Sequence, residues 1–179
     1  GIKASTIPNH LELTWISYAE KKFWKIDTAL PADKMLALFR EGVSYYNNQN
    51  ELQHKTYGGL CIGLAPGGVG VLWLDGSVKK VEIGRYQAKE IYVNKLDFEP
   101  VKDPSDSQEA YFDRRFKICV PKETQADILQ KGIPFGLWDA YRTKYNWRYH
   151  TISYKEGVDE FVSLETRDYI NGEFSMNHG

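Results

Sequence analysis

The residues best suited to metal, nucleophilic or phosphate chemistry are scattered along this sequence. The four histidines, His10, His54, His150 and His178, show neither HxxxH nor HExxH spacing, and no cysteine stands close to any of them. The sequence also lacks a Gly-x-Ser-x-Gly nucleophile elbow, a Walker loop and a GxGxxG fingerprint. We therefore expect no metal site and no cofactor.

Carboxylates are the remaining candidates for catalysis. Two pairs are worth testing as general acid and base: Asp75 with Glu82, and Asp113 with Asp139 beside Arg114, Arg115 and Arg142. A chain with 24 acidic residues offers such pairs by chance, and nothing in their spacing fixes a separation suited to proton transfer. The sequence therefore indicates a protein that is not an enzyme, with an unrecognised hydrolase as the minor alternative.

A run of aromatic and basic residues is more informative about binding. It contains Trp138, Tyr141, Arg142, Tyr145, Trp147 and Arg148. Trp, Tyr and Arg are the residue types most enriched at the energetic centres of protein interfaces. The run predicts a partner-binding surface, and the core and rim of a sheet is the alternative interpretation.

Composition limits the classes of partner. Lys and Arg number 23 against 24 Asp and Glu, giving a formal net charge of -1, so the chain has no strong field to attract nucleic acid or an anionic membrane. Acidic residues crowd the segment from 156 to 173, either as a solvated strand face or as an acidic docking surface. No apolar run is long enough to span a membrane. Aromatic residues make up 14% of the chain, which favours β structure and protein contacts.

The elements that must position these residues are mainly strands. Leu60 to Gly76 predicts a hairpin, because apolar arms flank Pro66-Gly67-Gly68 and Asp75-Gly76 marks a further reversal. Residues 11–18 and 22–28 alternate as a first hairpin, residues 77–84 add a strand, and residues 87–94 continue in strand-like fashion.

Two amphipathic segments predict helices. One runs over residues 32–46 behind Pro31, and the other runs from Pro121 to Gly132 with Ala126, Ile128 and Leu129 facing inward. Each follows a strand-like run, the second being residues 116–120, so the two halves of the chain resemble each other. A further meander is expected over residues 147–174, with turns at 155–157 and 170–172.

These elements define a fold class and a domain organisation. We predict an α+β fold that consists mainly of antiparallel sheet with two short amphipathic helices. If the internal match is a true duplication, the chain forms two pseudo-repeated β-helix-β-meander halves. Residues 1–10 form an N-terminal arm and residues 11–179 a single β-rich domain, with candidate halves 11–98 and 109–179 around a linker at 98–108. Cys61 and Cys119 either remain buried free thiols or form one disulfide in an oxidising compartment.

Three segments together carry a family resemblance. Residues 15–24 show W-x-S-x-x-E-x-K, Leu30-Pro31 opens the first predicted helix, and residues 64–76 show L-A-P-G-G-x-x-x-x-W-L-x-G. In this order they resemble a domain-of-unknown-function family of Gram-negative lipoproteins found beside type VI secretion phospholipase effectors. The resemblance covers about the first half of the chain and brings no catalytic residues. Its matching positions, expected to be structural, are Trp15, Ser17, Glu20, Pro66, Gly67, Gly68, Trp73 and Gly76.

The resemblance implies a function. It describes a periplasmic immunity protein, lipid-anchored in its full-length form, that inhibits a phospholipase effector by occluding the active site or lid. The partner would be a lipase-type toxin, with no nucleic acid, and any membrane association would come only through a lipid anchor absent from this chain. The alternative is an envelope lipoprotein that binds a small ligand or a cell-envelope component.

Overall fold

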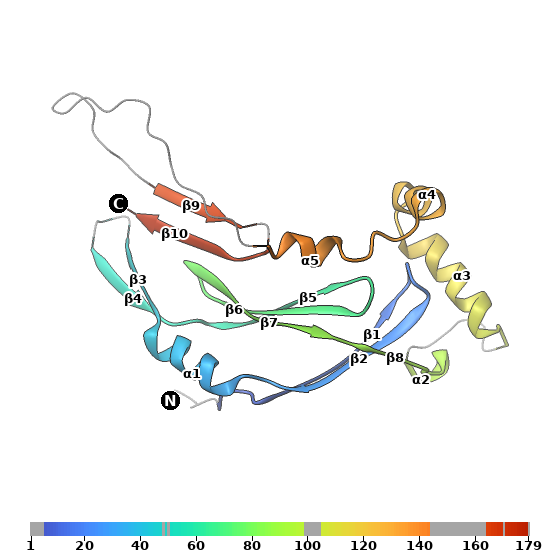
Figure 1. The fold of residues 1–179 in the computed structure, drawn as a ribbon, viewed down its shortest axis with the longest axis horizontal. Helices are drawn as coiled ribbons and strands as arrows, with labels where there is room; N and C mark the ends of the chain where they lie inside the picture. Colours follow the sequence, from blue (N-terminus) through green and yellow to red (C-terminus); the bar gives the residue numbers. More distant parts are fainter. Residues whose placement is uncertain are drawn as a thin grey trace, which may run out of the picture. The chain divides into compact units, whose positions relative to one another are not determined.

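The chain forms two compact units with a mainly antiparallel α+β fold, the predicted class (Figure 1). This computed structural model describes residues 6–47, 49, 51–98, 105–143, 164–169 and 171–178. Unit 1 comprises Gly1–Ala32, Ile62–Val71 and Gly84–Leu137, and unit 2 comprises Asp33–Cys61, Leu72–Ile83 and Trp138–Gly179. The units interleave along the sequence, while the single domain over 11–179 with halves 11–98 and 109–179 stays a prediction.

Unit 1 contains the predicted first hairpin. Strands β1 (His10–Ser17) and β2 (Lys22–Ala29) pair along their full length, and β8 (Lys89–Ile91) pairs with β2 so that Phe23 lies opposite Ile91. Successive side chains of a strand point to opposite faces. Phe23 is therefore buried on one face of this sheet, while Trp24 and Ile26 form a second buried cluster with Ala88.

Helix α3 (Gln108–Cys119) covers the Phe23 face with Tyr111 and Phe112. It begins at Ser107, whose hydroxyl accepts a hydrogen bond from the Ala110 N–H at 3.1 Å, as an N-cap residue does. The strand predicted over residues 116–120 is wrong, because residues 116–119 form the last turn of this helix. The element on which the internal repeat was based is therefore not a strand.

Two further helices flank α3 in the sequence. Helix α2 (Lys95–Phe98) precedes it and α4 (Lys122–Lys131) follows it (Figure 1). Gly132 caps α4 as predicted, with its N–H bonded to the Ile128 carbonyl at 2.9 Å. The predicted inward-facing stripe is wrong, since α4 buries no residue and Leu129 is 81% exposed.

The second sheet has the strand order β5-β6-β7-β10-β9. Its first three strands, β5 (Gly59–Ala65), β6 (Val69–Asp75) and β7 (Lys79–Gln87), confirm the predicted hairpin and the strand after it. Strands β9 (Leu164–Asp168) and β10 (Phe174–His178) form a hairpin, and Gly172, with φ +83°, lies in the turn predicted at 170–172. The turn predicted at 155–157 lies outside the described residues.

The first predicted helix is shorter than expected. Helix α1 (Ala32–Glu41) ends before Gly42, and residues 43–46 form β3 (Val43–Tyr46), which pairs with β4 (Leu52–Lys55). Gly42 has φ +58°, and a Cβ there would lie 2.6 Å from the Lys55 carbonyl oxygen. The close approach of β4 and the positive φ together stop the helix at Glu41.

Both cysteines are free in this structure. Cys61 is half-buried, and Cys119, expected to be buried, is exposed at the end of α3. Within the described segments, no helix combines the length and apolar character needed to cross a membrane.

Candidate functional site

Three of the six residues predicted to bind a partner can be placed. Trp138 and Tyr141 belong to the short helix α5 (Leu137–Tyr141), and Arg142 follows directly. Trp138 is half-buried and Tyr141 is 38% exposed. Tyr145, Trp147 and Arg148 lie outside the described residues, so the predicted surface as a whole stays a prediction.

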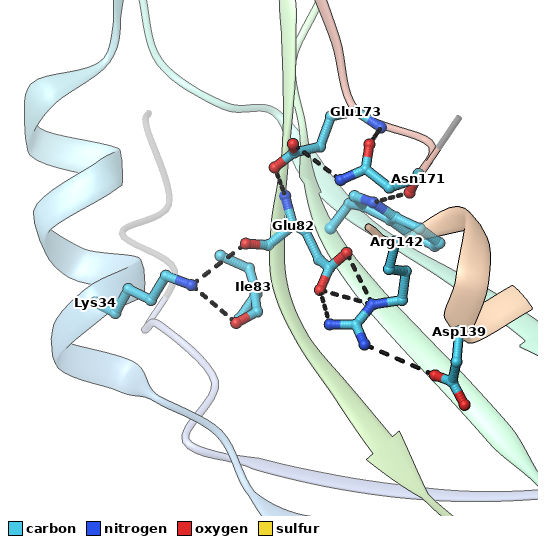
Figure 2. Close-up of polar contacts among 8 residues, drawn as sticks. Lys34, Glu82, Ile83, Asp139, Arg142, Asn171 and Glu173 are labelled. Carbon is cyan, nitrogen blue, oxygen red and sulfur yellow. Dashed lines mark hydrogen bonds and ion pairs between the residues drawn. The ribbon is translucent and has the colours of Figure 1, made fainter. Parts of the chain in front are cut away.

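Arg142 is bound within unit 2 to carboxylates (Figure 2). Its Nε lies 3.1 Å from both carboxylate oxygens of Glu82, a terminal nitrogen bonds the same carboxylate, and the other terminal nitrogen lies 3.7 Å from Asp139. The side chains of Glu82 and Arg142 are 12% and 29% exposed. The hydrogen bonds to Glu82 raise the pKa of Arg142 above its ordinary value. A guanidinium held in this way links α5 to β7 and is not a free contact group.

The same strand is held by further hydrogen bonds (Figure 2). The Glu82 N–H donates to Glu173 at 2.9 Å, and the other Glu173 oxygen accepts from the Asn171 amide at 3.0 Å. Trp73 Nε1 donates to the Asn171 carbonyl at 3.1 Å. Lys34 on α1 donates to the carbonyl oxygens of Glu82 and Ile83 at 3.3 and 2.9 Å. We call these residues the Arg142 cluster; they fix the β9–β10 turn, α1 and the end of α5 onto β7.

The proposed acid/base carboxylates each have a basic partner. Asp75 lies 3.6 Å from Lys80, Asp113 forms an ion pair with Lys21, and Glu82 and Asp139 both contact Arg142. The hydrogen bond and charge of Lys21 lower the pKa of Asp113. A carboxyl group that acts as a general acid near neutral pH needs a raised pKa. The surroundings of Asp113 shift its pKa in the opposite direction.

Other chemical groupings are few in the described part of the chain. Ser44 and His54 face each other across the β3–β4 pair, with Oγ and Nδ1 3.2 Å apart. Both are exposed, and no described carboxylate is hydrogen-bonded to His54 to orient it as a base. Among the same residues, no group of three His, Cys, Asp or Glu side chains is placed to hold a metal ion.

The two longer motif segments, residues 15–24 and residues 64–76, are joined through Glu20. One carboxylate oxygen accepts the Gly67 N–H at 2.7 Å, and the other accepts Trp24 Nε1–H at 3.2 Å. Ser17 accepts the Glu20 N–H at 3.3 Å, which holds the β1–β2 turn. Glu20 therefore joins the first hairpin to the Pro66–Gly68 turn.

The other motif positions also have local structural roles. Trp15 pairs across the hairpin with Trp24, and a Cβ at Gly68 would lie 2.6 Å from the Trp24 ring. The Gly76 N–H donates to the Lys79 carbonyl at 3.0 Å in the β6–β7 turn. Trp73, as described, donates to the β9–β10 turn. Pro66 lies in the turn that Glu20 holds.

An apolar pocket in unit 1 was not predicted from sequence. It has a volume of about 500 Å³, and its floor contains the buried rings of Phe23 and Phe112 beside Ile91. Tyr92, 79% exposed, lies at its edge. We call this the Phe23–Phe112 pocket. The only sequence signal was an aromatic residue directly after a short strand, which is too common a pattern to single out Tyr92.

Two basic side chains around this pocket are paired with carboxylates, and Glu109 at the start of α3 also lines it. Lys22 binds Glu90 at 2.7 Å, and Lys21 binds Asp113. The pocket therefore offers an apolar floor beside two ion pairs, where a partner can bury an apolar side chain. Exposed Leu96 and Phe98 follow Tyr92 in the sequence, and the Phe98 ring meets Phe23 edge-on with centroids 5.0 Å apart.

Comparison with known proteins gives one family. The family model described as "Protein of unknown function (DUF2931)" matches residues 1–136. No curated protein and no solved structure matches the chain. The matched residues include both motif segments and the whole Phe23–Phe112 pocket, whereas Trp138, Tyr141 and Arg142 lie beyond them. Because the match covers more than half of its 179 residues, the chain belongs to the DUF2931 family.

Proposed function

We propose that this protein is a protein-binding inhibitor: a periplasmic immunity protein, lipid-anchored in its full-length form, that blocks a type VI secretion phospholipase effector. The structural observation that carries the binding part of this proposal is the Phe23–Phe112 pocket with the exposed Tyr92 at its edge. The target class rests on the resemblance of the two motif segments to lipoproteins found beside such effectors.

The pocket has the features of an interface centre. Interface energy concentrates where aromatic residues and a desolvated pocket meet, with near-neutral contacts around them. Phe23 and Phe112 are held by the fold itself, edge-to-face with centroids 5.6 Å apart, so the pocket is formed before any partner binds. Preorganisation reduces the entropic cost of association. A loop or lid of the effector that inserts an apolar side chain here would be held away from its open position.

The experiment measures hydrolysis of phospholipid vesicles by the phospholipase effector encoded beside this protein, in the presence of the purified chain. We expect stoichiometric inhibition by the natural sequence. Tyr92→Asp should weaken inhibition about 30-fold, the size of an interface hot spot of about 2 kcal/mol. The matched control is Leu129→Asp, which places the same charge at an equally exposed apolar position on α4, beyond the other end of α3 (Figure 1).

Two results would contradict the proposal. A folded chain that neither binds the effector nor slows lipid hydrolysis would exclude the inhibitor function. If Leu129→Asp abolished inhibition and Tyr92→Asp left it intact, the protein would still be an inhibitor, but its contact surface would lie on α4.

A further inference from the structure

Unit 2 contains a larger pocket beside β10. Its volume is about 770 Å³, and among the described residues it is lined by the end of α1, the start of β3, the end of α5 and parts of β7 and β10. We call it the β10 pocket. Small-molecule sites commonly have volumes of about 300–1,000 Å³. The β10 pocket is therefore large enough for a ligand of one or two rings.

The charged groups that line the pocket balance one another. Two are acidic, Glu41 and Glu173, and two are basic, Lys79 and Lys80. Both carboxylate oxygens of Glu173 already accept hydrogen bonds, and Lys80 lies over the Phe174 ring with its Nζ 3.6 Å from Asp75. Burying a charged ligand requires an opposite charge to compensate it. A lining without net charge favours a neutral ligand.

The remaining lining combines aromatic rings with hydroxyl groups. Tyr141 and Tyr169 line the pocket and are 38% and 36% exposed. Ser44, Thr143 and Ser175 supply hydroxyls that can both donate and accept hydrogen bonds, and the Ser44 hydroxyl also lies 3.2 Å from His54 Nδ1. A sugar ring has an apolar C–H face that packs on aromatic rings and a periphery of hydroxyls that bond groups of this kind. The chemistry of the lining therefore corresponds to that of a saccharide.

The wall of the pocket is rigid before a ligand arrives. Asn171 and Glu173 line the pocket and belong to the Arg142 cluster, in which hydrogen bonds of 2.9 to 3.1 Å join the β9–β10 turn to Trp73 and Glu82. Arg142 separately fixes the end of α5, which carries Tyr141. A preformed site loses less entropy on binding. The cluster thus provides a support for the pocket.

From these features we propose that the β10 pocket binds a neutral saccharide of one or two rings. Its C–H face packs against Tyr141 and Tyr169, and its hydroxyls bond Ser44, Thr143 and Ser175. The inference does not depend on the proposed inhibition, because every residue of the β10 pocket belongs to unit 2 and every residue of the Phe23–Phe112 pocket belongs to unit 1.

Saturation-transfer NMR and titration calorimetry on the whole chain test this site. The neutral probes are glucose, N-acetylglucosamine, maltose and N,N′-diacetylchitobiose, and the charged probes are glucuronate and glucosamine. We expect saturable binding of at least one neutral probe in preference to both charged ones. Tyr141→Ala should weaken it about tenfold, the effect of removing one well-packed aromatic contact. The matched control, Tyr92→Ala, removes an exposed tyrosine of unit 1 and should leave affinity unchanged.

Thr143→Val provides a second variant, which removes one hydroxyl while keeping the side-chain shape, and circular dichroism verifies its fold. It should also weaken binding. Failure of all four neutral probes to bind, stronger binding of a charged probe, or unchanged affinity in a folded Tyr141→Ala or Thr143→Val variant would overturn the proposal.

Discussion

Replacing Gly68 by alanine should destabilise the protein through two separate effects. Gly68 has φ +71°, a conformation that costs other residues about 1–2 kcal/mol. An added Cβ would also lie 2.6 and 2.8 Å from two carbons of the Trp24 ring, which is buried and bonded to Glu20. Overpacking of a filled core costs about 1–3 kcal/mol. We therefore expect Gly68→Ala to lower the free energy of unfolding by about 2–5 kcal/mol.

Two other glycines separate these effects in the same chain. Gly136 has φ +82° with no atom within 4 Å of an added Cβ, and Gly59 has the same open space without a positive φ. Urea unfolding followed by circular dichroism should give Gly136→Ala a loss of about 1–2 kcal/mol and Gly59→Ala little change or a gain of up to about 1 kcal/mol. A Gly68→Ala loss no greater than that of Gly136→Ala would refute the role assigned to Trp24.

Three further predictions concern polar contacts. Glu20→Ala leaves the Gly67 N–H and the Trp24 indole N–H without their acceptor, so unfolding free energy should fall by about 1–3 kcal/mol in urea titrations. Arg142→Met should lower the free energy of unfolding by about 2–4 kcal/mol, less than the roughly 3–5 kcal/mol typical of breaking a fully buried ion pair. Adding Glu82→Gln to this variant should restore part of the lost stability, and no restoration would mean that the two side chains are not coupled. The pKa of Asp113 in the folded protein lies below its ordinary value of 3.8, so its ionised carboxylate stabilises the fold above pH 3.8 and this stabilisation is lost as pH falls through the folded pKa. In Asp113→Asn, the free energy of unfolding should therefore fall less steeply with decreasing pH in this acidic range.

The hairpins could be predicted because their signals are local. Alternating apolar residues and the Pro66–Gly68 turn specify β5 and β6 within a few residues, and the first hairpin follows from the same alternation. Helix α3 could not be predicted in this way. The β-favouring residues 116–120 conceal a helix that is held by burial of Tyr111 and Phe112 against Phe23, which is distant in sequence. Its one local signal was the Ser107 cap with Glu109 in the first turn.

The candidate sites were harder to predict, because each depends on contacts between distant segments. Arg142 looked like an interface residue by type, yet the fold pairs it with Glu82, 60 residues earlier. The Phe23–Phe112 pocket needs the β1–β2 turn, the end of β8 and the start of α3 in one place. Glu20 was identified through the motif, but its two hydrogen-bond donors could only be found in the folded structure.

Hydrogen–deuterium exchange of the chain with and without the effector locates the surface that the effector covers. We expect binding to protect peptides covering residues 87–98 and 105–116, which contain the end of β8, Tyr92 and the part of α3 that lines the Phe23–Phe112 pocket. Peptides covering 122–136, which contain α4 and Leu129, should exchange at the same rate in both samples. Protection confined to residues 122–136, or no protection in any peptide, would contradict the claim that the Phe23–Phe112 pocket is the binding surface.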